Sequence, residues 1–156
     1  MITIGKLLSV AQSLGVTVCT AILPGDLLGF YVHEARRIML ESRLSPFEMC
    51  VVLAHELGHA HHGHSCKNGH REAVPAHEYR ADRYAARLLI DGAELARLEQ
   101  INPDPEYLAE ELGVTVDFLG WYQQHHLTKL EYSTYAGARE GIGQFDYRQD
   151  HHELTA

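Results

Sequence analysis

Residues 44–63, with the sequence LSPFEMCVVLAHELGHAHHG, constrain the fold more than any other stretch of the chain. Ser45 is followed by Pro46, and Glu48 comes three residues after the serine. This is the pattern of a capped helix start, in which the serine and glutamate side chains satisfy backbone N–H groups at the helix end. The run 49–54 that follows is apolar on every face of a helix. We therefore predict a helix that begins at residue 46 and is buried against the rest of the domain.

The composition is typical of one globular domain. The chain has 156 residues, of which 46% are hydrophobic and 22% charged, and this length suffices to bury a core without disulfides. The formal net charge is −8 with only 13 Lys and Arg. Because phosphates are neutralised by clustered basic side chains, this balance disfavours direct binding of nucleic acid.

Two features predict a cytoplasmic location. Cys19, Cys50 and Cys66 are odd in number and widely spaced, as expected for free thiols in a reducing compartment. Residues 1–15 lack the cationic start and apolar core of a secretion signal, and the longest apolar stretch is broken at residues 24–26. We therefore predict neither export nor a membrane span.

The chain before the capped helix is predicted to form one helix and a small sheet. Residues 3–14 carry apolar side chains at helical spacing and end at Gly15, a residue type common just past a helix C-terminus. Three β-rich runs bounded by turn formers follow, at 16–23, 27–34 and 36–42. They predict a small antiparallel sheet of about three strands.

The chain after the capped helix is predicted to be helical. Residues 77–91 form a second amphipathic helix with Gly92 as its terminator. Shorter helices follow, one over 93–100 and two within 105–125. The fold class is therefore α+β, with one domain over residues 1–126 and a poorly periodic, loosely held tail over 127–156.

The helix predicted from residue 46 carries a metal-binding pattern. His55 and His59 are four residues apart, so both imidazoles lie on one face and can reach a single ion. Glu56 projects about 100° away around the axis, where it can address a water molecule rather than the metal. The chain holds 12 histidines, so this pentad alone is weak evidence and needs a third ligand from elsewhere.

The second helix supplies the best candidate for that ligand. Glu78 and Asp82 are also four residues apart, so one carboxylate can bind the metal while the other accepts the free ring N–H of a ligating histidine. His62 lies on the same face as His55, but about 10.5 Å of helical rise separates the two. His62 is therefore too far away to share the ion.

These residues make the chain resemble the gluzincin-like metallopeptidases of the ImmA/IrrE family. The resemblance rests on LPGDLLGFYV, RIMLESRLSPFEMCVVLAHELGHAHHGH and HEYRADRYAARLLI, and runs over about residues 1–125. It implies an α+β fold in which a small sheet packs beside a pair of zinc-binding helices. It also implies that His55 and His59 are zinc ligands, that Glu56 is the catalytic glutamate, and that Glu78 is the third ligand.

The same resemblance implies a zinc-dependent endopeptidase. Members of the family from phages and mobile elements cleave a helix-turn-helix repressor, so a repressor protein is the expected substrate. Glu56 would take a proton from water and return it to the leaving amine. A donor to the oxyanion is also needed. The sequence offers four candidates for it: His70, His77, Tyr79 and Tyr84.

Two other functions compete with the peptidase hypothesis. One is a non-catalytic regulator, an anti-repressor or antitoxin, that keeps the zinc site but acts by binding a partner protein; unlike a peptidase, it would not need Glu56. The other is a structural zinc module. It is disfavoured because three protein ligands leave one position open, whereas structural zinc sites usually have four.

Two remaining features are predicted to have no chemical role. His61, His62 and His64 are interpreted as a solvated helix end or site rim. Residues 108–122 imitate a helix-turn-helix, but their second helix has no Lys or Arg at its start. We therefore predict a packing role for this segment rather than DNA reading.

Overall fold

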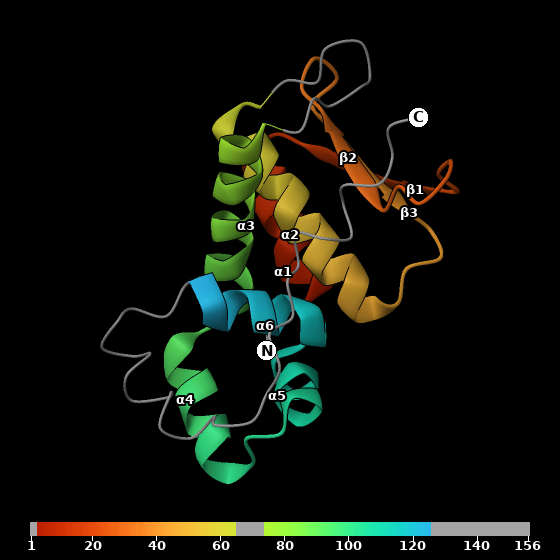
Figure 1. Ribbon diagram of the computed structural model, residues 1–156. Coiled ribbons are helices and arrows are strands. Elements are labelled where there is room, and N and C mark those ends of the chain that lie inside the picture. Colours follow the sequence, from red (N-terminus) through yellow and green to blue (C-terminus); the bar gives the residue numbers. More distant parts are fainter. Residues whose placement is uncertain (1–2, 65–73, 126–156) are drawn as a thin grey trace.

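The computed structural model describes residues 3–64 and 74–125, which form an α+β fold as predicted (Figure 1). In chain order the elements are α1 (Ile4–Ser13), β1 (Thr17–Ala21), β2 (Gly29–Val32), β3 (Arg37–Glu41), α2 (Pro46–His62), α3 (Pro75–Leu89), α4 (Gly92–Ile101), α5 (Pro105–Leu112) and α6 (Val116–His125). None of the helices in the described ranges has the length and hydrophobicity that a bilayer crossing needs.

The sheet is mixed, so the antiparallel sheet expected from the sequence is wrong for one of its two strand pairs. β3 lies in the centre, β2 pairs with it antiparallel, and β1 pairs with it parallel. Tight hairpins join strands through very short loops, but residues 22–28 form a longer connection between β1 and β2. This connection leads the chain away from β1, so β2 does not pair with β1. β3 takes the position next to β1 instead.

Glu41, the last residue of β3, holds this connection in place. Its carboxylate accepts a hydrogen bond from the backbone N–H of Leu23 at 2.7 Å and from the Arg43 guanidinium at 2.8 Å. The hydrogen bond from the Arg43 side chain, followed by the one from Leu23, holds the pKa of Glu41 far below its usual range. The carboxylate therefore stays ionised in the folded protein down to strongly acidic pH.

Glu41→Gln is expected to lower the melting temperature at pH 7. At this pH the Glu41 carboxylate is ionised in both the folded and the unfolded chain, and its hydrogen bonds stabilise the folded state. A depressed folded-state pKa gives stability that is present above the unfolded pKa and lost as the pH falls. The difference in melting temperature between wild type and variant should therefore shrink below about pH 4. Thermal melts across pH 2–7 test this, with the exposed Glu110→Gln as control. A difference that stays constant with pH would contradict it.

Helix α2 starts where the sequence predicts and forms the centre of the domain. The Ser45 side chain accepts from the backbone N–H of Glu48 at 3.3 Å, and the Glu48 carboxylate accepts from the backbone N–H of Ser45 at 2.8 Å. Figure 1 shows α2 between α3 and the sheet, with α1 behind it. Leu53 and Leu57 are fully buried, as expected for a helix enclosed on several sides.

Close approaches of the backbone fix α2 against its neighbours. A Cβ added to Gly58 would lie 2.7 Å from both the Cα and the carbonyl oxygen of Ala81, so α2 and α3 touch at backbone distance there. On the sheet side, a Cβ added to Gly29 of β2 would lie 2.7 Å from the Val52 side chain. Small residues at these two positions therefore allow α2 to pack tightly against both α3 and β2.

The helices after α2 are present as predicted but differ in their bounds, and α3 begins at residue 75 rather than 77. Helix α3 ends at Leu89, and Gly92 is the first residue of α4 rather than the terminator of α3. The Asp91 side chain caps α4 by accepting from the backbone N–H of Ala93 at 2.9 Å. An aspartate before a glycine thus marks a helix start here, because aspartate is a strong N-cap residue.

The segment that imitates a helix-turn-helix is packed against the domain. Leu112 and Leu119, from α5 and α6, are almost completely buried, and Gly113 makes the turn after α5 with φ +75°. This burial agrees with the packing role predicted for residues 108–122. Cys19 and Cys50 are free thiols, whereas Cys66 and the proposed tail over 127–156 lie outside the described residues.

Candidate metal centre

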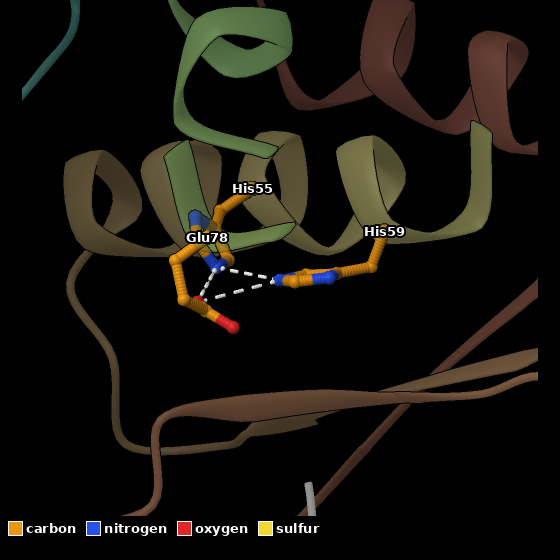
Figure 2. Close-up of side chains that lie close together, drawn as sticks. All are labelled: His55, His59 and Glu78. Atoms are coloured by element: carbon orange, nitrogen blue, oxygen red, sulfur yellow. Dashed lines mark hydrogen bonds and ion pairs between the residues drawn. The ribbon is translucent and has the colours of Figure 1, made fainter. Parts of the chain in front are cut away.

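Helix α2 places His55 and His59 side by side, as their spacing predicts. Their Nε2 atoms are 3.0 Å apart and their ring centroids 4.8 Å apart. Figure 2 shows both imidazoles extending from successive turns of α2 toward the same point. Two nitrogen atoms are thereby offered to one position beside the helix.

Glu78, from the first turn of α3, completes the group. Its Oε2 atom lies 3.2 Å from the Nε2 of His55 and 3.5 Å from the Nε2 of His59 (Figure 2). The bond lengths of a tetrahedral zinc site, 2.0–2.1 Å, separate neighbouring ligand atoms by about 3.3 Å. The three observed separations are close to this value, and these residues form a group that could hold one metal ion.

Asp82 lies on the outer side of His55, one turn after Glu78 on α3. Its Oδ1 atom is 2.8 Å from the Nδ1 of His55, so Nδ1 donates and Nε2 is left for the metal. Burial alone would lower the pKa of His55, but the hydrogen bonds to Asp82 and Glu78 outweigh it and raise the pKa to about 10. A metal ion that binds here must therefore displace a proton.

The three side chains of the centre differ in their exposure to solvent. The side chain of His59 is 1% exposed, whereas those of His55 and Glu78 are 20% and 26% exposed. Solvent or a ligand can thus approach from the side of His55 and Glu78. A centre with three protein ligands and an accessible face differs from a structural zinc site, in which four protein ligands enclose the ion.

Glu56, the predicted catalytic glutamate, follows His55 on α2 and is 2% exposed. Its negative charge is one of the causes that raise the pKa of His55, so its carboxylate lies within electrostatic reach of the centre. Glu56 is therefore held inside the protein, next to His55, rather than on the surface.

His64 is buried beside the centre, so of the two interpretations given for it, a solvated helix end or a rim of the site, the solvated helix end is wrong. It is 7% exposed, its Nδ1 lies 2.9 Å from the Nδ1 of His59, and its ring stacks on His77 with centroids 4.0 Å apart. Burial and the neighbouring His59 and His77 lower the pKa of His64 to about 4. The signal that could have found it is Gly63, because a glycine just past a helix turns the chain back.

The other residues singled out from the sequence are two exposed histidines and the candidates for the oxyanion donor. His61 and His62 are exposed as predicted, and His61 stacks on Tyr84. Tyr79 is 40% exposed and packs under the Arg83 guanidinium. Among the four candidates for the oxyanion donor, His70 lies outside the described residues. The contacts of the other three do not single out one of them.

The fold and the centre together define a class of protein. It is an α+β domain in which two packed helices bring together two histidines and one glutamate that could hold a metal ion, with a buried glutamate next to the first histidine. This arrangement is that of a metallopeptidase-like domain.

Comparison with known proteins places the chain within this class. The model of the IrrE N-terminal-like domain, a peptidase family, matches residues 11–120, and the chain belongs to this family. No curated protein sequence matches the chain. A solved structure named as a Mycobacterium tuberculosis transcriptional regulator is similar in fold, with a TM-score of 0.62 and 17% sequence identity. The match covers 84% of this chain and 44% of that one, so the chain spans less than half of that protein's length.

Proposed function

We propose that the protein is a zinc-dependent endopeptidase. The observation that carries this proposal is the convergence of His55, His59 and Glu78 from two helices on one point, with separations of 3.0–3.5 Å between their ligand atoms. The partial exposure of His55 and Glu78 and the membership of a peptidase family support catalysis rather than a purely structural role. Zinc is the metal that best suits two imidazoles and a carboxylate around an open position.

Each residue of the centre has a role in hydrolysis. Zinc bound by the three ligands would supply a Lewis acid that polarises a peptide carbonyl and lowers the pKa of water. Glu56 acts as the general base that takes a proton from the attacking water, and then as the acid that passes this proton to the leaving amine. Asp82 acts through His55, because its hydrogen bond fixes which ring nitrogen faces the metal.

We further propose that the substrate is a helix-turn-helix transcriptional repressor in the cytoplasm, cut when a phage or mobile element is derepressed. The resemblance to the ImmA/IrrE family supports this choice. The net charge of −8 supports action on a protein rather than on DNA itself. The experiment is to incubate the zinc-loaded protein with the repressor encoded beside it and to identify products by mass spectrometry.

The expected result is cleavage of the repressor at one or a few peptide bonds, with no cleavage of an unrelated helix-turn-helix protein. A specific site is expected because a peptidase selects its substrate through differences in transition-state binding. An intact repressor after prolonged incubation with the zinc-loaded protein would contradict the proposed substrate. Equal cleavage of both proteins would contradict the proposed specificity.

The second candidate function is a non-catalytic regulator that binds a partner protein. It is favoured by one observation, that the similar solved structure is named as a transcriptional regulator. Such a protein would release the repressor by binding it and would not need the carboxylate of Glu56. The two candidates therefore differ in whether a variant without this carboxylate still relieves repression.

A further inference from the structure

We infer that His64 is a positioning residue for the metal centre: it accepts the ring proton of His59 and so presents the Nε2 of His59 to the metal. This inference rests on the proposed metal centre but goes beyond it, because His64 is not among the three proposed ligands. It assigns a specific role to one histidine of the cluster that follows the HELGH pentad.

The turn at the end of α2 brings His64 back against the last turn of the helix. Gly63 has φ +66°, a left-handed conformation that favours glycine. Its N–H bonds to the carbonyl of Ala60 at 3.3 Å, and the N–H of His64 bonds to the carbonyl of His59 at 3.0 Å. These two bonds are those of the Schellman motif. In this motif the chain turns back at the glycine, so the residue after it, here His64, lies against the last turn of the helix. The metal ligand His59 lies in that turn.

The side chains then meet through one pair of ring nitrogens. The Nδ1 atoms of His59 and His64 are 2.9 Å apart, while the Nε2 of His59 faces His55 and Glu78. A neutral imidazole that binds a metal through Nε2 carries its proton on Nδ1. His59 must therefore donate from Nδ1, and His64 must accept at Nδ1.

This direction of the hydrogen bond fixes the tautomer of His64 as well. If its Nδ1 accepts, the proton of the neutral ring is on Nε2. The opposite direction would put the proton of His59 on Nε2, where it would block the metal. The contact is thus compatible with metal binding in only one arrangement.

His64 is itself held between the two helices of the centre. Its ring lies flat on that of His77, with centroids 4.0 Å apart and an angle of 10° between the rings, and His77 directly precedes the ligand Glu78 on α3. The ring of His64 therefore contacts the ligand-bearing turns of both α2 and α3.

The two histidine ligands are supported in parallel ways. Asp82 of α3 stands behind the Nδ1 of His55 at 2.8 Å, and His64 stands behind the Nδ1 of His59 at 2.9 Å. Outer partners of this kind orient ligands, and their loss typically weakens metal binding 10- to 100-fold. The sequence pattern identified the first partner but not the second.

Three substitutions test the role by zinc affinity, measured in competition with a chelator of known strength. His64→Phe keeps an aromatic ring to stack on His77 but removes the acceptor, and should weaken zinc binding roughly 10- to 100-fold. His64→Asn loses the ring but offers an amide oxygen near the position of Nδ1, and should bind zinc more tightly than the phenylalanine variant. His61→Phe, the same change at an exposed histidine, should bind zinc like the wild type.

The order of the two His64 variants separates hydrogen bonding from packing. If His64 only fills space, the phenylalanine variant should bind zinc like the wild type and the asparagine variant should bind it less well, and this order would overturn the inference. A wild-type protein that binds no zinc would overturn the proposed function and the inference together. Wild-type affinity in His64→Phe would overturn the inference alone.

A second measurement does not depend on the folding of any variant. Long-range ¹H–¹⁵N spectra of the zinc-loaded wild-type protein should place a proton on the Nδ1 of His59 and on the Nε2 of His64. A proton on the Nδ1 of His64 would overturn the inference.

Discussion

Glu56→Gln is expected to lower kcat/KM for repressor cleavage by about 10²- to 10⁴-fold, because the amide cannot accept the proton of the attacking water. This loss corresponds to roughly 3–5 kcal/mol of transition-state stabilisation. Glutamine has nearly the same shape as glutamate, and Glu56 is not among the three proposed ligands. The variant should therefore bind one zinc ion per chain and melt near the wild-type temperature.

Glu110→Gln is the matched control, since it makes the same change on an exposed face of α5. It should cleave the repressor at the wild-type rate. Cleavage by Glu56→Gln at a rate similar to the wild type would contradict the role of general base. If the variant loses cleavage but still relieves repression in cells, the non-catalytic regulator becomes the better account of function.

Gly58→Ala is expected to lower the free energy of unfolding by about 3 kcal/mol and the melting temperature by about 10 °C. The added methyl group would lie 2.7 Å from two backbone atoms of Ala81, and backbone cannot move aside as a flexible side chain can. Helices α2 and α3 must separate instead. Because Gly58 precedes His59 and Ala81 precedes Asp82, the separation should also weaken zinc binding.

Gly120→Ala separates this clash from the general effect of replacing a helical glycine. Position 120 lies within α6, and a Cβ there would meet no atom within 4 Å among the described residues. Alanine favours helix over glycine by up to about 1 kcal/mol, so this variant should be as stable as the wild type or more so. A Gly58→Ala protein that melts and binds zinc like the wild type would show that the two helices are not in contact at Gly58.

The features that the sequence predicts well are those that depend on neighbouring residues. The start of α2 is determined by Ser45, Pro46 and Glu48, which act within one turn. The shared face of His55 and His59 follows from helix geometry alone. The same holds for Glu78 and Asp82, so each half of the centre could be predicted before the two helices were placed together.

The features that the sequence predicts poorly depend on the path of the chain. The parallel pairing of β1 with β3 results from the route of residues 22–28, which local propensity does not specify. The burial of His64 depends on the turn at Gly63 and on the arrival of His77 from a distant helix. A histidine past a helix end has no periodic pattern to follow, so the sequence leaves open whether it is a solvated helix end or a rim of the site.

The contact between α2 and α3 is a further feature that pattern reasoning did not identify. Gly58 lies within the HELGH pentad, whose metal-binding pattern concerns the two histidines and the glutamate and does not specify a role for the glycine. Its importance becomes visible only when Ala81 is placed against it. Small residues at a helix contact serve the centre indirectly, because they determine how closely Glu78 approaches the two histidines.

A zinc-edge anomalous difference map of crystals grown with zinc would show whether His55, His59 and Glu78 bind one zinc ion. We expect one peak per chain, within about 2.0–2.2 Å of the Nε2 atoms of His55 and His59 and of a carboxylate oxygen of Glu78. A peak bound by other residues, or a peak at the two histidines with Glu78 beyond bonding distance, would contradict this expectation.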